Sequence, residues 1–371
     1  MKILGLAAHR PEKISVPIEA TDADLTMLDV SDQDNIIIKY MDLFLSGARV
    51  AASDDPPDVI ITKGANIIGL IGCLIGTLFR IPVIPRIAGD ILTLHREDCI
   101  ENYQDRNIAR LGKSILRYLL DWPVFWAADG LIVVSEYLEE ELRLYRTLRH
   151  KEIEIVPVHV TPPTRESRRP PTITPDIESP TTLLTVTNLN YRGKYSGIKS
   201  ILPVIYEVLE DRNETIYVIA GGGRYLPKLE RYINHTAPEM VNERIYTVGY
   251  VNDIYPVYNA ADLFLYFSFE DAYPNVIIEA LTVGLPIIAN PEVGIDEQLK
   301  HEQTGFLISS NNNTYMKQIL HSFFNNREKF HKVGHNGREM VLKRNHPENI
   351  GRQMIKALEL LTEQDRTLTE Q

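Results

Sequence analysis

The sequence predicts an α/β protein built from two doubly wound domains of parallel strands and helices. Three observations lead to this fold class. The chain has 371 residues, which is more than a single core usually organises. Short apolar runs alternate with helical segments in two separate stretches, and a proline-rich segment divides these stretches.

Five candidate strands and the helices between them make up the first predicted domain, residues 1–160. The strands are short and apolar, which is typical of a parallel sheet covered by helices on both faces. The longest apolar run, Ile67–Phe79, indicates a buried helix, since it is too short to span a bilayer. The expected strands cover residues 2–8, 58–62, 82–87, 130–135 and 153–158, and the main helices cover residues 35–51, 65–79 and 106–126.

A proline-rich linker, residues 161–180, is predicted to separate the domains. Seven of the 22 prolines lie between Pro157 and Pro180, and such a density cannot continue a helix or a central strand. The alternation of strands and helices then resumes and forms the second predicted domain, residues 181–345. Its expected strands cover residues 182–188, 215–221, 244–250, 262–268, 286–290 and 304–308.

The last segment, residues 346–371, is predicted to be an amphipathic helix that packs back on the first domain. Its apolar positions fall on one helical face: Ile350, Met354, Ala357 and Leu358. In doubly wound sheets, ligands bind at the carboxyl ends of the strands. With two such domains we therefore expect a binding cleft between them.

The composition indicates a folded, soluble protein and excludes several classes of function. Hydrophobic residues make up 44% of the chain and charged residues 24%, as in ordinary globular proteins. The net charge of −11 argues against general nucleic-acid binding, because a phosphate backbone would be repelled. It is compatible with a local basic pocket for one anionic ligand. The sequence has no spacing typical of a zinc site, and its histidines are scattered.

The sequence favours a cytoplasmic location, with contact at the inner face of the membrane as a second option. Two cysteines, Cys73 and Cys99, do not make a disulfide framework. The N-terminus passes from a short apolar strand to a charged loop, unlike a secretory signal. Arg110–Gly130 combines basic residues with Leu, Trp and Phe, as helices at a membrane interface do. Burial inside the domain explains this composition equally well, and the strand that follows favours burial.

Basic side chains and glycines follow the first two strands of the second domain. Arg192 and Lys194 lie in a loop after the first strand, and Gly222 and Gly223 follow the second, just before a helix start. Glycine lets the backbone approach a ligand closely, and a helix N-terminus favours an anion. These residues suit a diphosphate, although a plain strand-to-helix turn explains the glycines as well.

Three acidic residues follow the fourth strand of that domain: Glu270, Asp271 and Glu279. Asp271 and Glu279 could face the same cleft, with the N-cap of the helix as the rival role for Asp271. Gly294 precedes what reads as a second helix start. Carboxylates suit the vicinal hydroxyls of a sugar, whereas cations and helix ends suit a diphosphate. A nucleotide sugar contains both, so the sequence predicts a site for one.

The stretch DAYPNVIIEALTVGLPIIAN, residues 271–290, resembles the signature of glycosyltransferase family 4. In this signature an acid, seven residues and a Glu precede Ala-x-x-x-Gly-x-Pro. VIAGGGRYLPKLE and VGYVNDIYPVYNAADLFLYFS resemble further family segments in the expected order, and the resemblance covers residues 181–363. Residues 1–160 agree in architecture alone. The resemblance implies the GT-B fold, in which two Rossmann-like domains face each other across a cleft.

The family implies retaining transfer of a sugar from a nucleotide-diphospho-sugar, without a bound metal or other cofactor. Glu279 would hold the ribose hydroxyls, and Asp271, eight residues earlier, would contact the donor sugar. Lys194 and Arg192 would neutralise the diphosphate. Glu270 is one residue out of register and is expected to be a surface charge. The further donor-binding assignments are Gly222, Gly223, Asn275, Gly294, Ile295, Tyr250 and Val251.

Several positions depart from the family pattern. Asp271 stands where the family has Glu, and Asn188 where it has Arg. AAHRPEK replaces the glycine-rich loop often found after the first strand. Near the strand at residues 82–87 the family often has a His, whereas this chain has IAGD, so Asp90 is assigned as the catalytic substitute. His9 and His95 belong to no motif and are expected to be bystanders.

We therefore expect a retaining hexosyltransferase that acts on a saccharide or lipid-linked acceptor in surface polysaccharide or glycolipid synthesis. Two alternatives remain. A non-hydrolysing nucleotide-sugar epimerase would need carboxylates for proton abstraction in the first domain. A non-catalytic nucleotide-sugar-binding or scaffold protein would agree with the altered acid and the missing Arg. The expected partners are the sugar donor and the acceptor, and not nucleic acid.

Overall fold

The computed structural model describes residues 1–30, 35–89, 91–104, 106–160, 177 and 179–369. Within these residues the chain forms two compact units. The first comprises Met1–His159 together with Asn345–Gln371, and the second comprises Val160–Arg344. The segment predicted as a linker, residues 161–180, lies largely outside the described residues.

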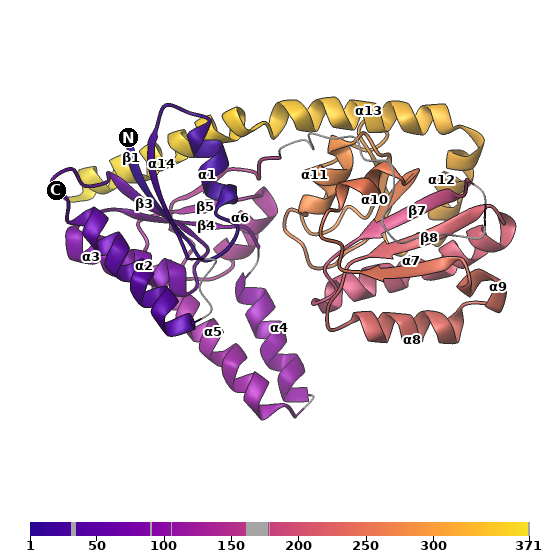
Figure 1. Ribbon diagram of the computed structural model, residues 1–371, viewed down its shortest axis with the longest axis horizontal. Coiled ribbons are helices and arrows are strands. Elements are labelled where there is room, and N and C mark those ends of the chain that lie inside the picture. The colour runs from indigo at the N-terminus through magenta and orange to yellow at the C-terminus, as the bar shows by residue number, and fades with distance from the viewer. Residues whose placement is uncertain (31–34, 90, 105, 161–176, 178, 370–371) are drawn as a thin grey trace. The chain divides into compact units, whose positions relative to one another are not determined.

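A six-stranded parallel sheet forms the centre of the first unit (Figure 1). The strand order is β2-β1-β3-β4-β5-β6, so the order reverses at β1. The switch point therefore lies between β1 and β3, and crevices for ligands form at such points, outside the carboxyl ends of these two strands. The strands are β1 (Lys2–Ala7), β2 (Asp24–Asp29), β3 (Val59–Lys63), β4 (Val83–Ile87), β5 (Leu131–Val133) and β6 (Ile153–Ile155).

The five strands predicted for this unit are present, and β2 is an additional edge strand. The sequence of β2, DLTMLD, alternates exposed and half-buried residues and has an acid at each end. It therefore lacks the continuous apolar run that marks the central strands. Such a strand cannot be recognised from the sequence pattern alone; its pairing with β1 in the structure defines it.

Helices cover both faces of this sheet, as predicted. Figure 1 shows α1 and α14 on one face and α2, α3 and α5 on the other. The predicted helices at residues 35–51, 65–79 and 106–126 are α2, α3 and α5, whereas α1, α4 and α6 were not predicted. The helices are α1 (Glu12–Glu19), α2 (Ile36–Ala51), α3 (Ile67–Phe79), α4 (Ile91–Gln104), α5 (Ile108–Ala127), α6 (Glu136–Arg143) and α14 (Pro347–Thr369).

Asparagine side chains begin the three longest helices on the sheet's second face. Asn35 accepts from the backbone N–H groups of the first turn of α2, Asn66 does so for α3, and Asn107 does so for α5. An Asn at this position satisfies N–H groups that have no partner within the helix. At the other end of α3, Arg80 adopts a left-handed conformation that stops the helix.

The C-terminal helix α14 packs against the first sheet and α1. Its four predicted apolar positions, Ile350, Met354, Ala357 and Leu358, are all buried there, at 0–2% exposure. They join a core with Ile3, Ile14, Ile18, Val59, Ile61, Ile84, Ile132 and Val156. The contact with α1 is close, since a Cβ atom at Gly351 would lie 1.9 Å from the carbonyl oxygen of Pro17.

The second unit contains another six-stranded parallel sheet, of order β12-β11-β10-β7-β8-β9. Counted from its own first strand this is the order 6-5-4-1-2-3, the classic dinucleotide-binding order, with the switch point between β7 and β10. All six predicted strands are present. They are β7 (Thr181–Val186), β8 (Thr215–Ala220), β9 (Ile245–Gly249), β10 (Leu263–Tyr266), β11 (Ile287–Ala289) and β12 (Phe306–Leu307).

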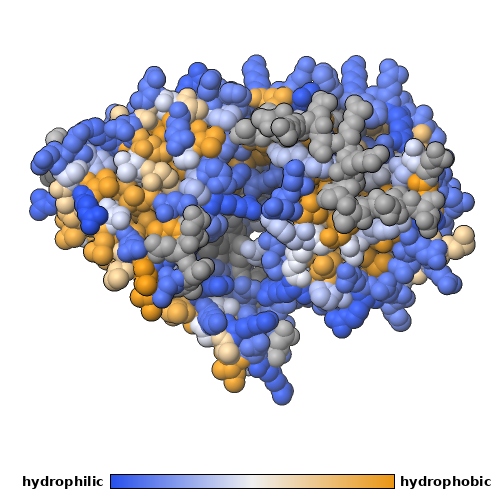
Figure 2. Space-filling model, viewed as in Figure 1, coloured by the Kyte–Doolittle hydropathy of each residue, from blue (hydrophilic) through white to orange (hydrophobic). Residues whose placement is uncertain are grey.

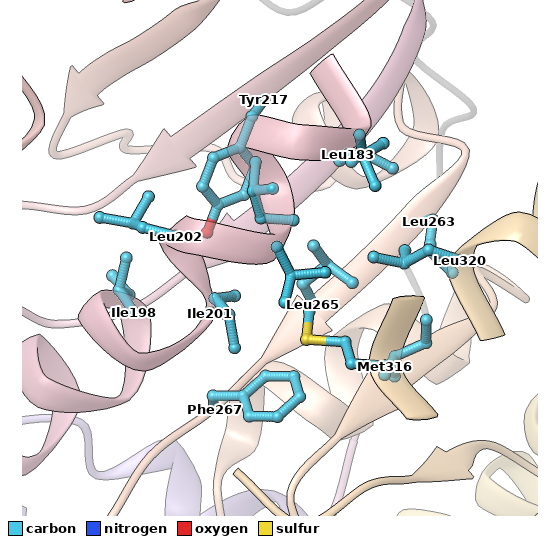
Figure 3. Packing of buried hydrophobic residues seen from close by; sticks show 14 of the residues in the cluster. Leu183, Ile198, Ile201, Leu202, Tyr217, Leu263, Leu265, Phe267, Met316 and Leu320 are labelled. Carbon is cyan, nitrogen blue, oxygen red and sulfur yellow. The ribbon is translucent and has the colours of Figure 1, made fainter. Parts of the chain in front are cut away.

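The core of the second unit joins this sheet to helices on one face (Figure 3). Leu183, Leu263 and Leu265 project from neighbouring central strands toward Ile201 and Met316 of two helices. Burial of such aliphatic side chains is the main stabilising contribution to an α/β layer. The helices of this unit are α7 (Arg192–Asp211), α8 (Leu226–Thr236), α9 (Glu239–Asn242), α10 (Tyr255–Asn259), α11 (Asn275–Thr282), α12 (Asn313–Asn325) and α13 (Arg327–Arg344).

Candidate functional site

The candidate site lies at the switch point of the second sheet. The chain leaves β7 toward α7, which carries Arg192 and Lys194, and leaves β10 toward Asp271 and α11. Because β7 and β10 are hydrogen-bonded neighbours, segments that are about 80 residues apart in sequence meet at one edge of the sheet. The structure thus brings together the basic and acidic residues that the sequence singled out.

Asp271 is held between a lysine and a tyrosine. Its Oδ2 atom lies 2.7 Å from Nζ of Lys194 and accepts a 2.6 Å hydrogen bond from the hydroxyl of Tyr266. Both charged side chains are largely shielded, with 15% of Lys194 and 19% of Asp271 exposed. The rival role for Asp271 does not occur, because Pro274 is the N-cap of α11 and no side chain caps that helix.

The hydroxyl of Tyr266 is a fixed hydrogen-bond donor. Burial, followed by the nearby Asp271 charge, raises its pKa well above the ordinary value. Tyr266 therefore stays protonated over the physiological range and orients the carboxylate of Asp271. The short Asp side chain meets both of its partners without the extra methylene of Glu.

Glu279 has a matching tyrosine. It lies half-buried in α11, and its Oε2 atom accepts a 3.1 Å hydrogen bond from the hydroxyl of Tyr258. Burial and the Glu279 charge raise the pKa of Tyr258 well above its ordinary value, and the pKa of Tyr255 rises to about 12 for the same two reasons. Tyr258 is thus a permanent donor to Glu279.

The two acid–tyrosine pairs are linked through one aromatic stack. The ring of Phe264 lies 5.6 Å from that of Tyr258 and 6.1 Å from that of Tyr266. All three side chains are fully buried. The stack fixes the two hydroxyls, and through them the two carboxylates, on a rigid support. Sequence reasoning missed both tyrosines, although their place in and just before the apolar run DLFLYFS was a usable signal.

Arg192 and Lys194 were predicted to lie in a loop. In the structure they lie in the first turn of α7. The helix begins at Arg192, which is exposed, and Tyr191 precedes it as N-cap without a side-chain hydrogen bond. Gly193, between Arg192 and Lys194, serves close packing, since a Cβ there would lie 2.4 Å from Cβ of Glu270.

Glu270 was predicted to be a free surface charge. In the structure it is half-buried against the start of α7. Its Oε2 atom accepts a 2.6 Å hydrogen bond from the backbone N–H of Gly193. A carboxylate at this position satisfies an N–H group of the first turn and complements the positive end of the helix dipole. Glu270 thus anchors the turn that carries Lys194.

Gly222 and Gly223 form a tight turn after β8. Gly223 has φ +143°, and a Cβ there would lie 2.3 Å from the carbonyl carbon of Leu189. The carbonyl of Gly222 accepts from the N–H of Leu189. Gly223 therefore has a packing role next to the segment that leads into α7, whereas Gly222 has room for a Cβ atom. Their predicted contact with a donor stays a prediction.

The second helix start, expected after Gly294, is absent: residues 291–300 form turns. Gly294 has φ +78°, and the N–H of Ile295 donates to Glu292 within its own turn at 3.3 Å. Ile295 is fully buried. This loop is fastened to α11, because Nε2 of Gln298 donates to the carbonyl of Pro274 at 3.1 Å. The site consequently has one fewer helix N-terminus than the sequence suggested.

The remaining predicted residues fall around these elements. Asn275 is the first residue of α11 and is half-buried. Tyr250 follows β9, is 77% exposed and lies beside Gly222, with the half-buried Val251 next in sequence. Asp90 lies outside the described residues. No group of three or more His, Cys, Asp or Glu side chains in the described part of the chain could hold a metal ion.

The expectation that Arg110–Gly130 is buried is wrong for most of its length. Helix α5 exposes Ile108, Leu116, Leu119 and Trp126 by 57–83%. These positions follow one helical stripe, whereas burial is confined to its other side: Ser114, Asp121, Val124 and Phe125. Among the helices that the structure describes, none is long and apolar enough to cross a bilayer.

Two parallel sheets of these orders, each covered by helices, are the two Rossmann-like domains of the GT-B fold, as predicted. Solved structures of that fold resemble the chain over almost its full length. Sucrose-phosphate synthase from Thermosynechococcus elongatus has a TM-score of 0.73 at 17% identity, with 97% of this chain and 99% of that chain covered. Anabaena HepE in complex with UDP and glucose has a TM-score of 0.67 at 14% identity, with the same coverage.

The second unit also resembles a known family in sequence. Residues 172–340, just under half of the chain, match the model of glycosyl transferases group 1. A curated relative is the UDP-Gal:alpha-D-GlcNAc-diphosphoundecaprenol alpha-1,3-galactosyltransferase of Escherichia coli, which is 32% identical over 98 residues, 26% of this chain and 25% of that protein. For the first three curated relatives, the aligned segments span 32%, 25% and 44% of their length. The resemblance to a glycosyltransferase is thereby confirmed.

Proposed function

We propose that the protein is a retaining glycosyltransferase that moves a hexose from a nucleotide-diphospho-sugar to a saccharide or lipid-linked acceptor. The observation that carries the proposal is the Lys194–Asp271 ion pair at the switch point of the second sheet, within a domain that matches the model of glycosyl transferases group 1. A cation for a diphosphate and a carboxylate for sugar hydroxyls meet there within one contact. The solved complex of HepE with UDP-glucose supports the choice of a nucleotide sugar.

In the proposed mechanism the diphosphate of the donor takes over Lys194 from Asp271. The phosphate oxygens offer Lys194 a second anion, and Asp271, still held by Tyr266, becomes free to accept from a hydroxyl of the donor sugar. Glu279, held by Tyr258, accepts from the ribose hydroxyls. Both carboxylates are oriented before the ligand arrives, so little ordering is lost on binding.

The chemical step needs no protein nucleophile in this proposal. As the bond between the sugar and the diphosphate breaks, negative charge grows on the leaving diphosphate. Lys194 and Arg192 stabilise that charge. A leaving oxygen can accept the proton of the attacking acceptor hydroxyl on the same face of the sugar, which gives retention of the anomeric configuration. We propose that these cations make a metal ion unnecessary.

Binding of nucleotides and nucleotide sugars, followed by thermal unfolding, tests this function. A ligand at 100 times its dissociation constant stabilises a protein by about 2.7 kcal/mol, which is a readily measured shift in Tm. Glu279→Gln should weaken nucleotide-sugar binding, and Asp271→Asn should reduce transfer much more than binding. Absence of a shift with every nucleotide sugar would contradict both the transferase and an epimerase of the same fold.

Product analysis separates the remaining alternatives. A retained anomeric configuration in a transferred sugar supports the proposal, and inversion overturns it. Conversion of the nucleotide sugar without any acceptor would indicate the epimerase. Binding without any turnover, over a broad panel of acceptors, would indicate a non-catalytic nucleotide-sugar-binding protein.

We further propose that the acceptor is presented at the cytoplasmic surface of an anionic membrane and that α5 contacts this surface. Figure 2 shows hydrophobic residues gathered over α2, α3 and the end of the α4–α5 hairpin. On the side of α5 away from the apolar stripe lie Arg110, Lys113 and Arg117, all exposed. The single acid of this helix, Asp121, is 1% exposed and paired with His95. The relative that acts on a diphosphoundecaprenol acceptor supports the choice.

The charge of α5 favours a bilayer over a second copy of the chain as its partner. A chain with net charge −11 is repelled by anionic lipids unless cations face them locally. In a symmetric dimer the same stripe would meet itself, and two chains that each carry a net charge of −11 would be brought together. An amphipathic, cationic and exposed helix is the arrangement of proteins that lie on membrane surfaces.

Cosedimentation with vesicles tests the contact. The protein should bind vesicles of phosphatidylcholine with phosphatidylglycerol more strongly than vesicles of phosphatidylcholine alone. The double variant Leu116→Gln/Leu119→Gln should lose most of this binding, and Lys113→Gln/Arg117→Gln should lose its dependence on phosphatidylglycerol. The matched control is Met240→Gln in the second unit, since Met240 is 74% exposed outside α5. Equal binding by all variants would disprove the contact.

A further inference from the structure

The switch point of the first sheet gathers cationic side chains that no part of the proposed donor site uses. Lys63 ends β3, and its register partner on β4 is Arg86. Successive residues of a strand alternate between faces. Val59, Ile61 and Ile84 belong to the core beneath α1 and α14, so Lys63 and Arg86 continue these rows beyond the apolar core, at the carboxyl edge.

Arg86 is buried without a carboxylate partner among the described residues. Only 4% of it is exposed. One terminal nitrogen donates to the carbonyls of Val156 and Pro157, at 3.4 and 3.1 Å, and Nε has no hydrogen-bond partner. His159, 5% exposed, follows the same segment, and its Nδ1 also lacks a partner. Buried donors without acceptors are rare in native proteins, because each one costs free energy.

Further cations surround this pair, and part of the cluster is open to solvent. Nζ of Lys63 donates to the carbonyl of His9 at 3.0 Å, and Nζ of Lys39 donates to that of Ala8 at 3.1 Å. His9 and Arg10 are exposed and Lys63 is half-buried, so a small anion could reach the cluster from solution. AAHRPEK, which replaces a glycine-rich loop, thus brings two of the cluster's side chains.

Burial and mutual repulsion make the charged forms of these groups less favourable in the folded chain. Burial, with Arg10 next, lowers the pKa of Lys63 to about 8, and burial lowers the pKa of Arg86 to about 10. Burial, with Lys13 and Arg86, lowers the pKa of His159 to about 4. Glu12 is the acid that opposes this trend at Lys63 and His9. A fold that keeps repelling, poorly solvated cations together is typical of a binding site that awaits an anion.

We propose that Lys63, Arg86 and His159 bind a phosphate group at the carboxyl edge of the first sheet. A doubly charged phosphate can satisfy two cations and the unpaired Nε donor of Arg86 at once, and it can accept from His159 in the neutral tautomer that carries its proton on Nδ1. A single carboxylate charge does this less well. Resting on the proposed function, we assign this phosphate to the acceptor. The site itself lies in the first unit and is independent of whether transfer occurs.

Thermal unfolding of the full chain with two ligands tests the assignment. Inorganic phosphate, compared with sodium chloride at equal ionic strength, should raise the Tm of the wild type but not of Lys63→Met. UDP should raise the Tm of Lys63→Met but not of Lys194→Met, which in turn should still respond to phosphate. Lys356→Met is the matched control, since Lys356 is an exposed lysine of the first unit. This crossed pattern separates the two sites.

Each other outcome has a defined meaning. If Lys63→Met still gains stability from phosphate, or if sodium chloride reproduces the gain, the phosphate site is refuted while the donor site stands. If UDP has no effect but phosphate acts through Lys63, the proposed function fails and the phosphate site stands. Without ligand, Lys63→Met should have an equal or higher Tm than the wild type, because it removes a poorly solvated charge.

The source of the phosphate is tested with farnesyl phosphate, farnesol and inorganic phosphate. Stabilisation by farnesyl phosphate beyond that by inorganic phosphate, with none by farnesol, indicates a lipid-linked acceptor. Equal effects of the two phosphates indicate a water-soluble phosphorylated acceptor. No effect of either overturns the inference.

The wild-type chain offers a second readout that needs no variant. At pH 8, about half of a lysine with a pKa near 8 is neutral and nucleophilic, unlike ordinary lysines. Brief acetylation, followed by peptide mass spectrometry, should therefore label Lys63 several-fold faster than Lys356. Saturating phosphate should remove this difference, because a bound anion raises the pKa and covers the amine. Unchanged labelling of Lys63 in phosphate would count against the site.

Discussion

At the scale of single residues, the candidate site consists of carboxylates that are oriented by buried tyrosines. Asp271 meets Lys194 and Tyr266 at 2.7 and 2.6 Å, and Glu279 meets Tyr258 at 3.1 Å. The tyrosine rings belong to a packed stack that cannot move without disturbing β10. The precision of the site therefore rests on residues that never need to touch the substrate.

Tyr266→Phe should lower kcat while leaving KM for the donor nearly unchanged. A hydrogen bond to a charged group contributes about 1.5–3 kcal/mol, so we expect a loss of roughly tenfold to hundredfold in kcat. Steady-state kinetics with the donor identified by the binding panel would measure it. The matched control is Tyr217→Phe, whose buried hydroxyl pairs with Thr185 at 2.8 Å inside the core. A change of less than twofold in Tyr266→Phe, or equal losses in both variants, would contradict the positioning role.

Glu270→Ala should destabilise the second unit. The side chain accepts from the N–H of Gly193 at 2.6 Å, and the loss of such a contact at a helix start costs about 1 kcal/mol of the free energy of unfolding. Urea denaturation should show this loss. Glu270→Gln keeps an acceptor but removes the charge, so it should lie between Glu270→Ala and the wild type. An unchanged midpoint for Glu270→Ala would mean that the contact contributes nothing.

At the scale of elements, helices and strands that are marked by a local apolar run could be predicted from the sequence. Elements whose structure depends on a partner far away in the sequence could not. All six strands of the second sheet were predicted, because each is a short apolar run such as TIYVIAG. The eight-residue spacing in DAYPNVIIE led to the choice of Asp271 and Glu279 over Glu270; each of the two accepts a hydrogen bond from a buried tyrosine, and their roles toward a donor stay a prediction. The edge strand β2 was not predicted, since its alternating pattern depends on pairing with β1.

The start of α7 and the cluster of Lys63, Arg86 and His159 also depend on partners that are distant in the sequence. Arg192 and Lys194 were predicted in a loop after the first strand, yet Glu270, 77 residues from Gly193, accepts a hydrogen bond from the N–H of that glycine in the first turn of α7. Lys63, Arg86 and His159 were not predicted as a group, because three different segments of the first unit supply them. Only the register of β3 with β4 and the path of the chain after β6 bring them to one edge.

The cluster at the end of β3 and β4 should make stability sensitive to acid. The pKa of His159 is about 4 in the folded chain, against 6.5 ordinarily. As pH falls below about 6.5, the unfolded chain takes up the proton first, so the free energy of unfolding decreases until the pH reaches about 4. This residue alone should account for about 3 kcal/mol. Urea denaturation at several pH values, in buffers without phosphate, measures it, and His159→Met should flatten the dependence. A variant that loses as much stability as the wild type would contradict it.

At the scale of the whole molecule, the first unit is completed by a segment that follows the second unit in sequence. Helix α14 supplies Ile350, Met354, Ala357, Leu358 and Leu361 to the core under the first sheet. Gly351 fits tightly on Pro17, and a Cβ at Gly130 would lie 2.7 Å from the side chain of Leu361. The first unit therefore cannot be folded completely until the last part of the chain is available.

Deletion of residues 347–371 should unfold the first unit and leave the second folded. Loss of these five buried side chains removes about 10 kcal/mol of apolar burial, which is as large as the whole stability of a typical domain. The second unit keeps its own core and the Lys194–Asp271 pair. Limited proteolysis should then digest residues 1–159 and spare residues 181–344, and UDP should still protect the spared fragment.

The matched control removes residues 364–371 only, beyond Leu361, the last buried position among the α14 side chains that the structure describes. This variant should resist proteolysis like the intact chain, because it retains the described side chains of α14 that pack against α1 and the first sheet. If both deletions were equally resistant, α14 would be dispensable for the first unit, and its apolar face would need another explanation. If the longer deletion instead made the whole chain sensitive, the second unit would depend on the first for its stability. The two units would then be separate in their contacts but would not fold independently of each other.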